Sequence, residues 1–443
     1  MKSYSGKNWK LYNGNMLDML QVIEPCSIDS IVTDPPYELN FMGKGWDNSG
    51  IAFQPDTWRK CYQVLKSGGY LLAFGGSRTF HRIAVAIEDA GFEIRDVIMW
   101  LYGSGFPKSM NIGKAVESKL VNGSANTQAF KDLAGTKTAA GNWGMSKNSF
   151  DYGARPSDYS ADGHERTVDV DYQTELGRKW NGWGTALKPA YEPIIVARKP
   201  CVGSTTDNVI EYGVGALNID GCRIGTEEHT VNINDFSNQH GNKFGNGESI
   251  EKLGERTVVG RFPSNTILTY DNSDFQEVCG CMQVGFSAYE DSGSAARYFY
   301  CAKASKKDRD EGLEGFNDHD GGSYKFRVDG SLDGEIPVRK NLHPTVKPTE
   351  LMQYLIRLVT PKGGRVLDPF NGSGSTGKAV MYENNERGSG YEYVGIELTA
   401  EYIPITIARI QYAAKDISYE EYATPEIKEQ VEQKQMSIFD FIK

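Results

Sequence analysis

Short apolar runs and longer amphipathic stretches alternate along the first part of the chain. Pro55 to Leu65 and Arg78 to Ala90 have the length and spacing of helices. Turns at Ser67 to Gly69 and at Ala90-Gly91 precede the later apolar runs. This alternation of strands and helices predicts a parallel sheet that is covered on both faces. The runs that we predict to be buried strands are Ile28 to Thr33, Tyr70 to Phe74 and Ile94 to Trp100.

A second α/β segment lies toward the end of the chain. Apolar residues between Leu351 and Val359 recur at the spacing i, i+3, i+4, i+7 and i+8, which predicts a helix, and Pro361 to Gly364 ends it. Arg365 to Asp368 and Tyr393 to Glu397 are two further predicted strands, with a glycine-rich turn and a helix between them.

The stretch between these two pieces differs in composition. Residues 120–185 are rich in Gly, Asn, Ser, Asp and Thr and poor in aliphatic side chains, which predicts a long mobile loop. Glu192 to Ala197 is strand-like again, and we expect it to rejoin the sheet. Residues 200–340 carry short apolar runs among turn residues, which indicates a separate irregular module.

Composition limits the classes of protein to consider. The 443-residue chain is 39% hydrophobic and 24% charged, as in ordinary globular proteins, and it has no apolar run that predicts a membrane span or a signal peptide. Seven cysteines are an odd number, which favours reduced thiols in the cytoplasm over a disulfide framework. The net charge of −10 does not indicate a nucleic-acid partner, so such a partner would require local basic patches.

The tetrapeptide Asp34-Pro35-Pro36-Tyr37 directly follows the first predicted strand, at the sheet edge where open α/β proteins bind ligands. The exocyclic amino group of adenine is a poor nucleophile, because the ring delocalises its lone pair. The Asp34 carboxylate and the Pro35 carbonyl could accept its two hydrogens, and Tyr37 offers a face for stacking a flipped base. A proline turn with a capping acid is the alternative for this tetrapeptide.

A glycine-rich turn from Asp368 to Gly374 follows another predicted strand, and its glycines allow a ligand to approach the backbone closely. Gly372 to Lys378 fits the start of a phosphate-binding loop, but Ala379 replaces the Ser or Thr that binds magnesium, which argues against an NTPase. Glu397 ends the next strand, where an acid suits the ribose hydroxyls of an adenosine cofactor. A surface glutamate after a buried strand is the alternative.

Together these motifs resemble the DNA amino-methyltransferases. The tetrapeptide, the glycine-rich turn, Glu397 and the segment His343 to Pro348 match signatures of that family, in the order of its permuted β class. Other stretches resemble bacteriophage and prophage adenine methylases. The resemblance implies an α/β fold, a Rossmann-like S-adenosylmethionine-dependent methyltransferase sheet with an inserted target-recognition region. It also implies base flipping and methylation of adenine N6 in DNA, since Asp rather than Ser at position 34 favours adenine.

Three other functions stay open: methylation of adenine in RNA, methylation of cytosine N4 in DNA, and a non-catalytic DNA- or clamp-binding role for the same fold. The large insertion and the permuted order favour DNA, and the intact tetrapeptide argues against a non-catalytic role. Cys26 is read as an ordinary loop residue, because direct transfer to nitrogen needs no covalent cysteine. Cys279, Cys281 and Cys301 lack a paired C-x-x-C spacing, so we expect no metal.

The resemblance also implies roles for individual residues. Thr345 and Lys347 would hold the methionine carboxylate of the cofactor, and Asn15 would contact its adenine ring, although the family often has an acid at that position. The catalytic residues would be Asp34, Pro35, Pro36 and Tyr37. The residues around the cofactor would be Asn15, Asp34, Thr345, Lys347, Asp368, Phe370, Gly372, Gly374 and Glu397.

Partners are predicted from the remaining motifs. Double-stranded DNA would contact Lys44 and Trp46, which follow the tetrapeptide, and would also contact a separate basic run. A solvated helix face is the alternative for that run. The tail resembles the peptide by which bacterial proteins bind the replicative sliding clamp; its alternative is a tail packed on its own domain. A homodimer is implied by the resemblance alone. The residues of the basic run and of the clamp peptide are Lys303, Lys306, Lys307, Gln435, Ile438 and Phe439.

These expectations divide the chain into six segments. They are a catalytic half at 1–115, a flexible insertion at 116–186, a return strand at 187–200, a target-recognition region at 201–340, a cofactor-binding half at 341–415 and a tail at 416–443.

Overall fold

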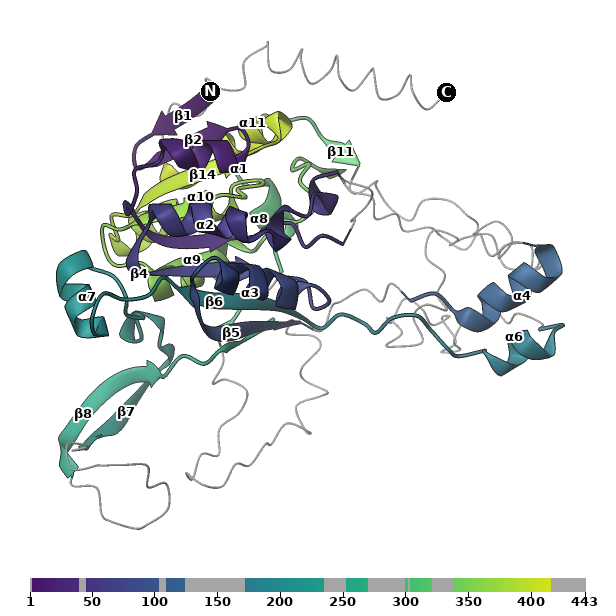
Figure 1. The fold of residues 1–443 in the computed structure, drawn as a ribbon, viewed down its shortest axis with the longest axis horizontal. Helices are drawn as coiled ribbons and strands as arrows, with labels where there is room; N and C mark the ends of the chain where they lie inside the picture. The colour runs from purple at the N-terminus through teal and green to yellow at the C-terminus, as the bar shows by residue number, and fades with distance from the viewer. Residues whose placement is uncertain are drawn as a thin grey trace. The chain divides into compact units, whose positions relative to one another are not determined.

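The structure is a computed structural model that describes residues 2–39, 45–102, 109–123, 172–234, 252–269, 299–301, 303–320 and 338–415. The chain forms two compact units (Figure 1). One unit takes its residues from Met1–Leu101, Tyr191–Phe316 and Asn341–Lys443, and the other from Tyr102–Ala190 and Asn317–Lys340. None of the helices in these described ranges is long and apolar enough to cross a membrane.

A ten-stranded sheet organises the first unit, in the order β1-β2-β14-β13-β3-β4-β6-β5-β9-β10. The neighbours from β2 to β4 are all parallel, as the alternation of strands and helices predicted. A separate antiparallel hairpin is formed by β7 (Ile224–Asn234) and β8 (Lys252–Arg261). The strands of the sheet are β1 (Lys2–Gly6), β2 (Trp9–Asn13), β3 (Ile28–Thr33), β4 (Leu65–Phe74), β5 (Glu93–Tyr102), β6 (Tyr191–Arg198), β9 (Thr266–Thr269), β10 (Phe299–Tyr300), β13 (Arg365–Asp368) and β14 (Glu392–Glu397).

The central strands bury both faces because helices cover each side. All six residues of β3 are buried, as expected for an inner parallel strand. Alternate residues such as Ile31 pack in one core with α1, α2 and α3, and Ser30 bonds to Thr360 after α9 at 2.7 Å (Figure 1). The helices of this unit are α1 (Met16–Met19), α2 (Pro55–Val64), α3 (Phe80–Asp89), α7 (Thr205–Tyr212), α8 (Lys306–Asp310), α9 (Thr349–Val359), α10 (Ser375–Arg387) and α11 (Ile403–Ala414).

Two details of the sheet differ from the sequence prediction. The stretch Ser67 to Gly69 was expected to be a turn, but β4 continues through it with an irregularity, since Leu65 pairs with Ile28 and Tyr70 pairs with Ser30. In addition, β6 is inserted between β4 and β5 and runs antiparallel to both. The first residues of β6 therefore lie at the same edge of the sheet as the last residues of β4.

The second unit contains two short helices and a two-stranded ladder. The helix α4 begins at Ile112, before the insertion predicted at 116–186, and α6 lies inside that predicted insertion. The buried carboxylate of Glu117 on α4 accepts hydrogen bonds from the backbone N–H groups of Gln173, at 2.6 Å, and of Thr174, at 3.2 Å. These bonds fix the start of α6. The elements are α4 (Ile112–Asn122), α6 (Glu175–Lys179), β11 (His319–Asp320) and β12 (Val338–Arg339).

Candidate active site at the carboxyl edge of the sheet

Three carboxylates follow three neighbouring parallel strands. Asp34 comes directly after β3, and Asp368 and Glu397 are the last residues of β13 and β14. The carboxyl ends of parallel strands meet at one edge, so the structure brings these three predicted residues together. A fourth carboxylate, Glu192, joins them because β6 is antiparallel and begins at this edge.

The two carboxylate oxygens of Asp34 differ in their hydrogen bonding. Oδ2 accepts a hydrogen bond from the Lys347 ammonium at 2.6 Å. Oδ1 is buried and has no hydrogen-bond partner among the described residues. Burial raises the pKa of Asp34, and the opposing charge of Lys347 offsets only part of this effect. A buried acceptor without a donor is costly to a folded protein, which makes Oδ1 a candidate ligand-binding atom.

Lys347 is the centre of a polar cluster with two carboxylates and a phenol. Its Nζ donates to the hydroxyl of Tyr37 at 3.2 Å and lies 3.4 Å from Glu192 Oε2, while the Tyr37 hydroxyl donates to that same oxygen at 3.0 Å. Burial lowers the pKa of Lys347, but Asp34 and Glu192 reverse that effect, so the net direction is upward. Lys347 is therefore a charged partner of the tetrapeptide that begins at Asp34.

Asp368 holds the glycine-rich turn in place. Its Oδ1 accepts from the Thr33 hydroxyl at 2.6 Å and from the Phe370 N–H at 3.1 Å, and its Oδ2 accepts from the Thr376 hydroxyl at 2.5 Å. Burial raises the pKa of Asp368 to about 6, although these hydrogen bonds act to lower it. Asp368 thus joins β3, β13 and α10, and Phe370 packs near Trp58 with ring centroids 6.3 Å apart.

The backbone of the turn requires glycine at two positions. Gly372 has φ +54°, and a Cβ there would lie 2.9 Å from His343 Nε2. Gly374 has φ +78°, and its Cβ would lie 2.9 Å from Thr406 Cγ2. The two glycines therefore permit the left-handed turn and its close packing. Burial lowers the pKa of His343 to about 3, so this ring is neutral at physiological pH, and its Nδ1 is 2.8 Å from the carbonyl oxygen of exposed Thr345.

Glu397 reaches back to the same turn. Its two oxygens accept from the backbone N–H groups of Gly372 and Thr399, each at 2.7 Å, and burial raises its pKa to about 7. An ionised carboxylate has about four acceptor positions, so Glu397 can accept further hydroxyl donors. Asn15 is exposed and caps α1, because its Oδ1 accepts from the Leu17 N–H at 2.9 Å.

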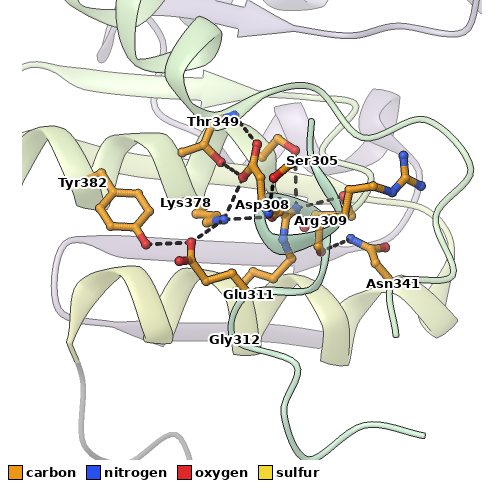
Figure 2. Close-up of polar contacts among 12 residues, drawn as sticks. Ser305, Asp308, Arg309, Glu311, Gly312, Asn341, Thr349, Lys378 and Tyr382 are labelled. Carbon is orange, nitrogen blue, oxygen red and sulfur yellow. Dashed lines mark hydrogen bonds and ion pairs between the residues drawn. The ribbon is translucent and has the colours of Figure 1, made fainter. Parts of the chain in front are cut away.

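A buried network fixes the segment around α8 (Figure 2). Lys378 is fully buried, and its Nζ lies 2.9 Å from both Asp308 Oδ1 and Glu311 Oε2. Asp308 also accepts from Thr349, at 2.5 Å from the hydroxyl and 3.0 Å from the N–H. An ammonium held by two carboxylates does not serve a bound phosphate, so the structure agrees with the argument against an NTPase.

The predicted DNA-contact residues fall in different environments. Lys306 and Lys307 are exposed on α8. Partial burial lowers the pKa of Lys303. The charge of Glu192 raises this pKa and that of Lys347 lowers it, which places Lys303 near the polar cluster. The backbone of Trp46 is in a short 3-10 helix, Gly45–Asn48. Lys44, Gln435, Ile438 and Phe439 and the side chain of Trp46 lie outside the described residues. Within the described ranges, no group of three or more His, Cys, Asp or Glu residues could hold a metal ion.

These features define a class of protein: an α/β fold with a candidate ligand site at the carboxyl ends of a largely parallel sheet, where acids follow successive strands. A family model described as DNA methylase, covering enzymes that act on N6 and N4 amino groups, matches residues 28–408. The chain belongs to this DNA methylase family.

Individual relatives are similar over shorter stretches. The Type II methyltransferase M.HindIII of Haemophilus influenzae is 26% identical over 167 residues, which is 37% of this chain and 37% of that protein. The DNA adenine methyltransferase YhdJ of Escherichia coli is 38% identical over 72 residues, 16% of this chain and 22% of that one. The chain thus spans less than half the length of these curated relatives. The solved complex of M1.HpyAVI with SAM is 15% identical, with a TM-score of 0.37 over 91% of this chain and 98% of that one.

Proposed function

We propose that this protein transfers a methyl group from S-adenosylmethionine to N6 of adenine at a specific site in double-stranded DNA, after flipping the base out of the helix. The observation that carries the proposal is Oδ1 of Asp34, a buried acceptor that has no donor among the described residues and lies in the family's tetrapeptide. Adenine offers an N–H donor that such an atom would accept.

The chemistry follows from the two acceptors of the tetrapeptide. Hydrogen bonds from N6 to Asp34 Oδ1 and to the Pro35 carbonyl would draw electron density onto the nitrogen and direct its lone pair at an incoming methyl group. Tyr37 would support the flipped base, since stacking on an aromatic ring is sequence-tolerant and strong. The ionised carboxylate of Asp34 is the stronger acceptor, and burial raises its pKa, so the transfer rate should increase as the pH rises through that pKa.

The residues at the neighbouring strand end suit the adenosine cofactor. Glu397 keeps acceptor positions for two ribose hydroxyls, and the turn at Gly372 and Gly374 leaves no Cβ in the way. Asn15, Thr345 and Phe370 would contribute the remaining contacts that the family resemblance implies. When bound, the cofactor supplies an electrophilic methyl group on a sulfonium. We keep Lys347 as a candidate for the cofactor carboxylate, beside its ion pair with Asp34.

The finer partner assignments are proposals as well. Lys44, Trp46, Lys303, Lys306 and Lys307 would contact DNA, with the lysines on phosphates. The protein would form a homodimer, which sedimentation would detect. Gln435, Ile438 and Phe439 would form a docking peptide, so deletion of residues 433–443 should abolish binding to a bacterial sliding clamp. Unchanged clamp affinity after that deletion would exclude the clamp peptide.

The test is methyl transfer from labelled S-adenosylmethionine to unmethylated genomic DNA, followed by mass spectrometry of the nucleosides. N6-methyladenine is the expected product; N4-methylcytosine or label on RNA alone would overturn the target. Asp34→Ala should reduce kcat about 100- to 1,000-fold with cofactor affinity retained. Asp56→Ala removes an exposed carboxylate on α2 and should leave the rate unchanged.

A further inference from the structure

We propose that Glu192 is a positioning residue for methyl transfer: it holds Lys347 and the hydroxyl of Tyr37 away from Oδ1 of Asp34 and so leaves that oxygen open to the target base. This proposal rests on the proposed function. Nothing in the sequence motifs marks Glu192, which the strand pattern gives only as the start of a returning strand.

The contacts of the cluster show how the ammonium is shared. Lys347 Nζ is 2.6 Å from Asp34 Oδ2 and 3.4 Å from Glu192 Oε2, so it lies between two carboxylates. The Tyr37 hydroxyl donates to the same Glu192 oxygen at 3.0 Å. Both donors also act on the Asp34 carboxylate, and without the negative charge of Glu192 Asp34 alone would hold the ammonium, so that Lys347 could bridge its two oxygens. The free acceptor Oδ1 would then be occupied before the base arrives.

The backbone around Glu192 is held from both sides. Its neighbour Pro193 accepts a hydrogen bond from the Gly75 N–H at 2.9 Å on one side and pairs with Met99 of β5 on the other. The next residue, Ile194, is fully buried. Glu192 therefore projects from a rigid strand end, which suits a residue that must hold two mobile donors in place.

Charge gives Glu192 a second effect on the same reaction. The Glu192 carboxylate offsets part of the positive charge of Lys347 and Lys303, which favours the positive charge that develops on N6 as the methyl group arrives. The titratable and charged groups that act on Asp34 are Lys347, Glu192, Tyr37 and Asp368, and Lys303 acts on the cluster. Among these, Glu192 raises the pKa of Asp34 and Lys347 lowers it.

The experiment compares Glu192→Gln with wild type in two measurements. The first is the pH dependence of kcat and KM with DNA. The second is the titration of Asp34 in the protein alone, by NMR of aspartate labelled with ¹³C at Cγ, with the signal assigned by its loss in Asp34→Asn. Glu93→Gln is the matched control, because Glu93 pairs with Arg198 at the other end of β6 at 2.8 Å.

In Glu192→Gln, which keeps an acceptor oxygen but loses the charge that holds Lys347, we expect kcat to fall about tenfold with little change in the KM for DNA. The acid limb of the pH profile and the Asp34 titration should both move to lower pH, since a neutral amide no longer raises the pKa of Asp34. Glu192→Asp keeps the charge, so it should lose rate without that shift. An unshifted Asp34 titration in Glu192→Gln would overturn the inference. The NMR result does not depend on turnover, so failure of the proposed function is detected separately, by wild type that does not methylate adenine.

Discussion

Replacing Lys378 by methionine should destabilise the first unit severely. The Lys378 ammonium is fully buried and contacts Asp308 Oδ1 and Glu311 Oε2, each at 2.9 Å, and it donates to the Asp308 carbonyl at 2.9 Å (Figure 2). Methionine keeps most of the volume but supplies no charge and no donor. Two carboxylates would then stay partly buried with fewer partners.

The magnitude follows from what each carboxylate keeps. Asp308 retains the two donors of Thr349, and Glu311 retains the Tyr382 hydroxyl at 2.8 Å. Removal of one partner from a buried ion pair typically costs about 3–5 kcal/mol, because the remaining charge is uncompensated. Since both carboxylates keep some donors, we expect a loss of about 3 to 5 kcal/mol in the free energy of unfolding rather than the sum of two such losses.

Urea unfolding followed by circular dichroism at 222 nm measures this change. The control is Arg365→Met, which removes a surface ion pair with Glu392 of similar length, 2.7 Å, in which both side chains are well exposed. That variant should lose less than about 1 kcal/mol. A loss below about 1 kcal/mol in Lys378→Met would refute the view that this network anchors α8, and would reopen a role for Lys378 at a ligand.

Three more outcomes follow from the site and from the second unit. The affinity for S-adenosylmethionine should weaken about tenfold per pH unit below the Glu397 pKa of about 7, because only the ionised carboxylate accepts two hydroxyls. Titration calorimetry measures this pH dependence, which should be absent in Glu397→Gln. Gly372→Ala should lower thermal stability more than Gly388→Ala. Both residues have positive φ, where an added side chain costs about 1–2 kcal/mol, but only at Gly372 would the new Cβ meet a neighbour within 4 Å. Glu117→Ala should speed proteolysis near α6, because it removes the acceptor that fixes the start of that helix.

Each of these outcomes has a result that contradicts it. Affinity independent of pH between about 6 and 8 would separate Glu397 from the ribose hydroxyls. Equal stability of Gly372→Ala and Gly388→Ala would mean that the His343 ring moves aside without destabilising the protein. Unchanged cleavage in Glu117→Ala would mean that α6 does not depend on the carboxylate.

Much of the sheet could be predicted because most of its inner strands carry short apolar runs with clear ends. β3 and β13 have the predicted bounds, and the helix predicted from Leu351 to Val359 is α9, which begins at Thr349. Once strands are parallel, the acids that follow them must share an edge, so Asp34, Asp368 and Glu397 were expected together. Periodicity and strand ends suffice for such conclusions, because each depends on local sequence alone.

The partners of these acids could not be predicted, because they depend on strand direction and on side-chain packing between distant segments. An apolar run specifies a buried strand but not the direction in which it joins the sheet. Had β6 been parallel, Glu192 would lie at the opposite edge, far from Lys347. Because β6 is antiparallel, its first residues meet the last residues of β4, and a glutamate outside every recognisable motif contacts both Lys347 and Tyr37. The same reasoning applies to Lys378: the motif around it resembles a phosphate loop, and only the packing of α8 against α10 shows that its charge is neutralised by Asp308 and Glu311.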